Sequence, residues 1–392
     1  MKKALLWLVV VVVCVFAGLW IGSAAMNRRA GDKPWPAGLG TLREVDARHP
    51  KQTASAAARR LTELARPVGI DFTGKKPDDA IRAEIAIYVQ AQHQQATPAI
   101  GEPPTGVVAY FDQNTLQINA LRDHLLSGSE VQWAVDREQG FEAPLPNLLA
   151  HLHTARLLTA RALVQGRANR IAAWDDLHAA AAVGRSLESR SELISHLIAL
   201  AVARMVNAAA WKLPLPVPAW WSATESVDQR RILLGAMQAE TSMMWHRADA
   251  SMKGVFYRLA SPYTRYAMAS YAIHQRETAE LISTLTDCGL DAAAFDAKRR
   301  ALIPRWNVMA RVAAPNLASI WSRALRYEAE REATANALRV RAGQPIVERS
   351  QCSDGSWTYM HGTLSFGRGL PMPSPQTVMP LLLQIAEGQS VQ

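Results

Sequence analysis

The residues that could hold a metal ion are histidines and carboxylates close together in predicted helices. A helix places two ligands on one face at spacings of three or four residues, whereas His151 and His153 are two residues apart. That pair cannot chelate a metal from a regular helix. Two other pairs have a workable spacing, namely Glu192 with His196 and His274 with Glu277. Because such pairs arise often by chance, we expect neither a bound metal nor a cofactor.

Catalytic nucleophiles usually belong to recognisable motifs, and the sequence lacks them. It contains no Gly-x-Ser-x-Gly elbow, no glycine-rich phosphate loop and no alternation of strands and helices. The adjacent carboxylates Asp78 with Asp79, and Asp175 with Asp176, lie at predicted helix starts. Negative charge there offsets the helix dipole, so we interpret them as capping residues rather than as acid–base pairs. The sequence therefore predicts no catalytic residue.

Aromatic and methionine side chains gather between residues 243 and 271, with arginines among them. Tyrosine, methionine and arginine are enriched at protein interfaces, and tyrosine with arginine also suits the surface of a lipid bilayer. The alternative is an aromatic seam inside the helical core. We call the candidate interaction residues the aromatic cluster, and they are Trp245, Phe256, Tyr257, Tyr263, Tyr266 and Tyr271.

The three cysteines allow one disulfide outside the N-terminal apolar run. Cys14 lies inside that run, which leaves Cys288 and Cys352. A bond between them would close a loop of roughly 64 residues and contribute on the order of 4 kcal/mol in the chain-entropy model, provided the compartment is oxidising. The alternative is two unrelated buried thiols.

The N-terminus begins with a long apolar run behind Lys2 and Lys3. The run and the small residues after it form a segment, 4–25, of roughly 33 Å as a helix, which is enough to cross a bilayer. A cleaved secretory signal is the alternative, since Ser23 and Ala25 are small residues suited to a peptidase site. The run is longer than a usual signal, so we expect residues 1–30 to be a retained transmembrane signal-anchor.

The orientation of the anchor depends on its flanks, which carry Lys2 and Lys3 before the run and Arg28, Arg29 and Lys33 after it. The positive-inside rule does not separate these two sides. A very short leading segment suits an anchor that leaves its N-terminus in the cytoplasm. We therefore expect a single-pass protein of the bacterial inner (cytoplasmic) membrane with its body in the periplasm.

Composition excludes several classes of protein. The chain has 392 residues, of which 49% are hydrophobic and 20% charged, so it is not a disordered protein. The net charge is +9, but residues 1–33 carry five basic groups and one acidic group, which leaves +5 for the rest. The remaining basic residues are scattered among acids. We expect no nucleic-acid partner.

Apolar periodicity predicts a mostly α-helical protein of stacked antiparallel helical hairpins. The clearest helices are expected over 147–166, 171–187 and 193–211, and the last of these is the most apolar and should be central. Short apolar runs on either side of His361 and Gly362 predict a small C-terminal β-hairpin. The expected divisions are a flexible linker over 31–50, helical block 1 over 51–212, a proline-rich linker over 213–222, helical block 2 over 223–343, and the β-hairpin with a proline-rich tail over 344–392.

A resemblance supports this fold. Residues 145–212 contain W-x-x-L at Trp174, R-S-L at Arg185 and L-I-S-x-L at Leu193. In this arrangement the stretch resembles uncharacterised bacterial membrane-anchored, mostly helical envelope proteins. The resemblance implies the fold and no activity.

Function is left as three hypotheses. The first is an interaction or scaffold module of the envelope, with a protein partner there, because the chain combines helical hairpins with one anchor and lacks catalytic motifs. The second is an envelope enzyme that acts on a glycan, lipid or peptide in a groove between the helical blocks. The third is a subunit of a larger membrane machine.

Overall fold

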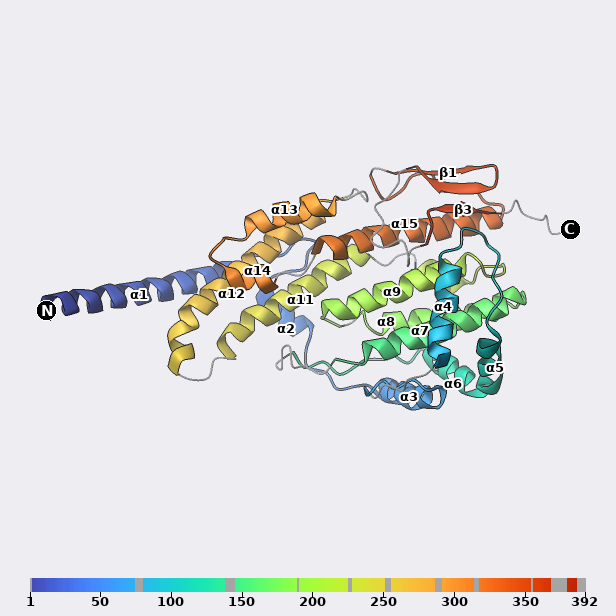
Figure 1. Ribbon diagram of the computed structural model, residues 1–392, viewed down its shortest axis with the longest axis horizontal. Coiled ribbons are helices and arrows are strands. Elements are labelled where there is room, and N and C mark those ends of the chain that lie inside the picture. Colours follow the sequence, from blue (N-terminus) through green and yellow to red (C-terminus); the bar gives the residue numbers. More distant parts are fainter. Residues whose placement is uncertain are drawn as a thin grey trace.

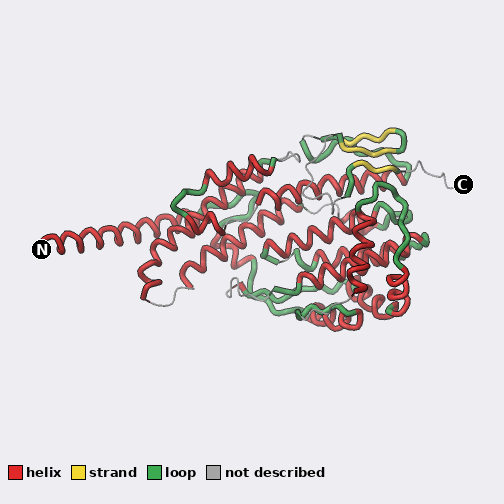
Figure 2. The backbone as a smooth tube through the Cα atoms, in the orientation of Figure 1, coloured by secondary structure: helices red, strands yellow, loops and turns green. Residues whose placement is uncertain are grey.

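The computed structural model shows a mostly helical protein with a small three-stranded antiparallel sheet near the C-terminus (Figures 1 and 2). This agrees with the helical class predicted from the apolar periodicity. The residues that the structure describes are 2–74, 80–137, 145–188, 190–224, 228–250, 255–285, 291–313, 317–353, 355–367 and 379–385.

The elements follow one another along the chain in a helical order that ends in the sheet. The helices are α1 (Lys2–Asp32), the 3₁₀ turn η1 (Leu42–Glu44), α2 (Val45–Arg48), α3 (Ala56–Ala65), the 3₁₀ turn η2 (Arg66–Val68), α4 (Ala80–His93), α5 (Thr105–Gln113), α6 (Thr115–Leu126), α7 (Leu148–Arg167), α8 (Ala173–Arg185), α9 (Leu193–Ala210), α10 (Ala219–Thr224), α11 (Gln229–Ala250), α12 (Val255–Ser283), α13 (Ala292–Leu302), α14 (Val308–Ala313) and α15 (Leu317–Arg341). The strands are β1 (Trp357–Met360), β2 (Thr363–Phe366) and β3 (Leu382–Gln384).

Helix α1 projects from the body as a long stalk (Figure 1). Trp7 and Ile21 on this stalk are 70% and 72% exposed, whereas Ser23 and Ala30 near its C-terminal end are buried. That end packs on α12 and η1. The helix is long and apolar enough to cross a membrane.

Helix α9 also has the length and apolar composition of a membrane span, but its surroundings differ from those of α1. It packs against α4, α7, α8, α11 and α15, and most of its side chains are buried. An apolar helix that is mostly covered by protein is a core helix. The sequence-based expectation that residues 193–211 form the central helix matches this position.

The segment 31–50 was expected to be a flexible linker, and the structure instead packs it on the body. Trp35, Leu42 and Val45 are buried, and the amide of Gln238 on α11 donates to the carbonyls of residues 39, 40 and 41 at 3.1–3.3 Å. The prolines and glycines of the segment suggested a tether, but its apolar side chains are buried against the body. The body is therefore attached to α1 by a packed connection.

The proline-rich segment 213–222 joins the two expected helical blocks. Leu213 and Trp221 are buried, and the Trp174 indole Nε1 on α8 donates to the Pro214 carbonyl at 2.7 Å. One apolar cluster includes residues of both blocks, so their helices share a core.

The C-terminal hairpin was predicted at its observed position. β1 pairs with β2 in an antiparallel register that places Trp357 opposite Phe366. His361 and Gly362 form the turn, both with positive φ, as the two-residue turns of hairpins require. The third strand was not predicted, because residues 382–384 were assigned to the proline-rich tail, expected to be an extended strap or a loose tail, and they pair with β2. A pairing across the intervening proline-rich stretch has no local sequence signal.

Candidate functional site

The aromatic cluster divides between core and surface. Trp245 and Tyr271 are buried at 9% and 4% exposure, and burial raises the pKa of Tyr271 above its ordinary value. Tyr271 packs with Ile303 and Ala310. These two members of the cluster are structural.

Tyr263 and Tyr266 lie farther toward the N-terminal end of α12, beside Trp306. Tyr263 is 43% exposed, and its hydroxyl donates to the Trp306 carbonyl at 3.3 Å. The ring of Tyr266 lies 5.2 Å from the Trp306 ring, centroid to centroid. Phe256 and Tyr257 belong to α12, but their side chains lie outside the described part of the structure. The exposed aromatic surface is thus formed by Tyr263 and Trp306, which is 42% exposed.

This aromatic surface adjoins the base of the stalk. The guanidinium of Arg265 lies 5.2 Å from the centre of the Trp20 ring on α1, a cation–π distance. The Trp245 indole Nε1 donates to the Asn27 Oδ1 at 2.9 Å, and a Cβ placed on Gly31 would lie 2.8 Å from the Trp245 ring. Helices α11 and α12 therefore hold the base of α1 through aromatic contacts.

The disulfide expectation falls partly outside the description. Cys14 is a free, exposed thiol, whereas Cys352 is buried and disulfide-bonded. Cys288 lies outside the described residues, so its pairing with Cys352 stays a prediction.

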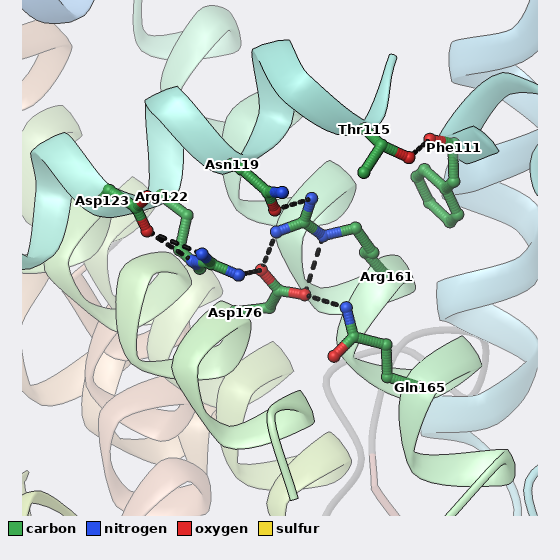
Figure 3. A network of polar contacts seen from close by, with 8 residues as sticks. All are labelled: Phe111, Thr115, Asn119, Arg122, Asp123, Arg161, Gln165 and Asp176. Carbon is green, nitrogen blue, oxygen red and sulfur yellow. Dashed lines mark hydrogen bonds and ion pairs between the residues drawn. The ribbon is translucent and has the colours of Figure 1, made fainter. Parts of the chain in front are cut away.

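The structure describes only one of the two pairs of carboxylates that were interpreted as helix caps. Asp78 and Asp79 lie outside the described residues. Asp175 and Asp176 do lie in the first turn of α8, as expected. Asp176, however, is fully buried and accepts hydrogen bonds from Arg161 and Gln165 on α7 (Figure 3). Its main role is to join two helices rather than to cap one.

The polar network around Asp176 is closed to ligands. The Arg161 Nε lies 2.7 Å from the Asp176 Oδ2, and the other oxygen accepts from the Arg161 Nη2. Arg122 approaches the same carboxylate at 4.0 Å and also pairs with Asp123, and Asn119 accepts from Arg161 at 3.0 Å (Figure 3). Burial raises the pKa of Asp176, and the Arg161 guanidinium opposes that rise. We interpret this network as structural.

The histidines considered as metal ligands are held by other groups. His151 is buried between the rings of Phe72 and Trp133, and its Nδ1 lies 2.9 Å from the Asn147 carbonyl oxygen. His153 lines a separate cleft beside Asp71. The described part of the chain holds no group of three or more histidine, cysteine or acidic residues arranged for a metal ion.

Of the two pairs with helical spacing, one is in direct contact and the other is not. His274 Nδ1 lies 3.0 Å from the Glu277 Oε2. Glu192 instead receives two hydrogen bonds from the Arg190 guanidinium, and the His196 Nε2 lies 2.8 Å from the Arg190 carbonyl. Glu192 and His196 therefore both bind Arg190, and they are not placed to coordinate one metal ion together.

A cleft with a volume of about 320 Å³ is lined by residues of α4, α7, α9 and α15. Arginines from three helices line it, with His93 and Gln90 from α4 at one wall. Apolar side chains of α4, α7 and α9 cover the remaining surface. The arginines are Arg156, Arg204 and Arg323, and the apolar residues are Ala86, Leu152, Leu197, Leu200, Ala201 and Met205. We call this site the arginine cleft.

The cleft carries uncompensated positive charge. Arg204 is paired in two-point geometry with the buried Glu330, at 2.7 Å for each hydrogen bond, and Arg326 shares the same carboxylate. Arg156 is half-buried, and burial alone lowers its pKa. Within the described chain, no carboxylate contacts Arg156, so its charge faces the cleft without a partner.

His93 adds an unsatisfied polar atom to the same wall. Burial lowers its pKa to about 4, with Glu330 opposing that effect and Arg204, Lys212 and Arg326 reinforcing it. Its imidazole is therefore neutral at pH 7. The Nε2 is buried and has no hydrogen-bond partner among the residues that the structure describes. Buried polar atoms are nearly always satisfied, and a ligand or a water molecule in the cleft would supply the partner that this atom lacks.

Comparison with known proteins identifies no relative. No protein-family profile matches the chain, and no curated protein or solved structure matches it significantly.

The arginine cleft was not predicted from the sequence, because its residues are scattered between positions 86 and 323. Arg156 follows Leu152 by one helical turn and lies among apolar residues of α7, as Arg161 does. An arginine on a largely apolar helix marks either an internal ion pair or a ligand. Only the tertiary structure separates these two cases.

Proposed function

We propose that the protein is a single-pass protein of the bacterial inner membrane whose periplasmic helical body, built of stacked hairpins, is an interaction or scaffold module. The exposed apolar surface of α1 supports the membrane part of this proposal, and the exposed Tyr263 and Trp306 are its candidate contact surface for a partner. Trp7, Val13 and Ile21 are each at least 60% exposed on one helix, and water would solvate such a surface poorly. A bilayer would cover it.

The base of α1 supports a fixed position of the body at the membrane. Asn27, Gly31 and Ser23 pack against the body, and the connection through Trp35 and Leu42 is buried. The exposed Tyr263 and Trp306 lie beside this base, where aromatic side chains with a polar atom favour the membrane–water interface. The surface of the body next to the bilayer is therefore aromatic.

An interaction module fits the described side chains better than an envelope enzyme does. The arginine cleft lies between residues of the two helical blocks, but the described residues that line it include one histidine and no carboxylate. General acid–base catalysis works best with a group whose pKa lies near the operating pH, and burial lowers the pKa of His93 to about 4. The buried carboxylates Asp176 and Glu330 are engaged by arginines.

Membrane insertion is tested by alkaline extraction of membranes that contain the full chain. We expect the protein to stay in the membrane pellet, and a variant with Val11→Lys and Val12→Lys to be extracted. Protease treatment of intact spheroplasts should then digest the body if it is periplasmic. Extraction of the unaltered chain by alkali would overturn the membrane assignment, and a protected body would overturn the periplasmic one.

The interaction surface is tested by photo-crosslinking in cells. A photoreactive amino acid at Tyr263 should give one reproducible adduct, whereas the same group at the exposed Leu116 on α6, which is 79% exposed, is the control. Adducts to lipid alone, or the same adducts from both positions, would contradict a protein partner at this surface.

A further inference from the structure

We propose that the arginine cleft binds a small amphipathic oxyanion, whose phosphate or carboxylate group lies against Arg156 and Arg323 and whose apolar part lies on α9. The inference rests on the cleft alone and does not depend on the membrane proposal.

The charge of the cleft selects an anion. Glu330 neutralises at most one of the two arginines that share it, Arg204 and Arg326, so it leaves no charge for Arg156. Arg156 is half-buried, where an unpaired charge is costly. Arg323 is exposed at the rim and adds a second positive charge. An oxyanion would compensate both groups.

Arginine also indicates the chemical type of the anion. Its planar guanidinium presents paired N–H donors that match the oxygens of a phosphate or carboxylate. The neutral imidazole of His93 offers one more polar atom, because the tautomer protonated at Nε2 donates a hydrogen bond. The unsatisfied Nε2 would gain an acceptor from the same ligand.

The remaining lining indicates that the anion carries an apolar body. Leu197, Leu200 and Met205 of α9, with Leu152 of α7, form the apolar wall. Inorganic phosphate would leave that wall in contact with water. A volume of about 320 Å³ is at the lower end for ligand pockets, so the ligand is a short-chain molecule or the end of a longer one.

Calorimetric titration of the full chain in nanodiscs of neutral lipid tests the proposal with four probes. Hexyl phosphate and hexanoate present the two oxyanions on one apolar chain, hexanol presents the chain alone, and inorganic phosphate presents the anion alone. We expect saturable binding of at least one of the two amphipathic anions, about tenfold tighter than hexanol and inorganic phosphate. The tighter of the two identifies the oxyanion.

Variants locate the binding. Arg156→Met keeps the apolar stem of the side chain and should weaken binding at least tenfold, whereas Arg167→Met on the same helix, outside the cleft, should change it less than twofold. Arg323→Met provides a second variant at the exposed rim, where the fold is tolerant, and His93→Phe removes the polar atom. Absence of binding by both amphipathic anions, equal binding of hexanol or of inorganic phosphate, or unchanged binding by Arg156→Met and Arg323→Met would overturn the proposal.

Discussion

Arg161 on α7 and Asp176 on α8 form a two-point ion pair in which the carboxylate is completely buried. Gln165 donates to the same carboxylate at 2.9 Å, and Asn119 on α6 accepts from the guanidinium. The pair therefore joins three helices that are consecutive in the chain. Two buried charges of this kind stabilise the fold only while both are present.

Removal of one charge from this pair is expected to be strongly destabilising. Asp176→Asn leaves Arg161 buried without a counter-charge and should lower the free energy of unfolding by about 3–5 kcal/mol. Asp123→Asn is the matched control, since Asp123 pairs with Arg122 in the same network but is 63% exposed, and it should cost less than about 1 kcal/mol. Denaturant unfolding measures both changes. Equal losses in the two variants would show that Asp176 is not the centre of the network.

Gly31 is expected to be required where α1 meets α11. A Cβ at this position would lie 2.8 Å from the Trp245 ring, which cannot move without losing its hydrogen bond to Asn27. Gly31→Ala should therefore lower stability by about 1–3 kcal/mol, seen as a lower thermal midpoint in detergent. Gly18→Ala has open space around it and should leave the midpoint unchanged or raise it. A Gly31→Ala midpoint as high as that of Gly18→Ala would mean that α1 and α11 are not packed as described.

His151 is expected to make the fold sensitive to acid. Burial lowers its pKa from 6.5 to about 4, so the unfolded chain binds more protons between those two pH values. The free energy of unfolding should consequently fall as the pH decreases from 6.5 to 4, by on the order of 3 kcal/mol from this residue. Unfolding measured across this range should show a smaller pH dependence in His151→Phe. A His151→Phe profile of unaltered slope would exclude His151 as the cause.

Gln238 is expected to fix the connection between α1 and the body. Its Nε2 donates to three carbonyls of the connection, and its Oε1 accepts from Arg48 at 2.8 Å. Gln238→Leu leaves these groups unsatisfied, at a cost of about 1–3 kcal/mol, so amide hydrogen exchange over residues 36–48 should accelerate by about tenfold. Gln117→Leu, at an exposed position of α6, should leave the amide exchange of residues 36–48 unchanged. Equal exchange in the two variants would contradict a packed connection.

The sequence predicted helices and strands well where the residues that specify them lie within one segment. The apolar periodicity of residues 147–211 predicts α7, α8 and α9 to within a few residues, because each helix must bury one face. The turn at His361 and Gly362 predicts the hairpin for a similar local reason. Acidic residues at a helix start, by contrast, carry no information on burial, and so the role of Asp176 was missed.

The sequence by itself determined the helical class, the apolar N-terminal helix and the C-terminal hairpin, since each depends on neighbouring residues. The tertiary structure decided which of the aromatic residues are exposed, that the segment 31–50 is packed, and that β3 joins the sheet. It also brought Arg156, Arg204, Arg323 and His93 to one cleft from four helices. These features depend on contacts between residues far apart in the chain, and the charge of an arginine acquires its meaning only from the groups that surround it in space.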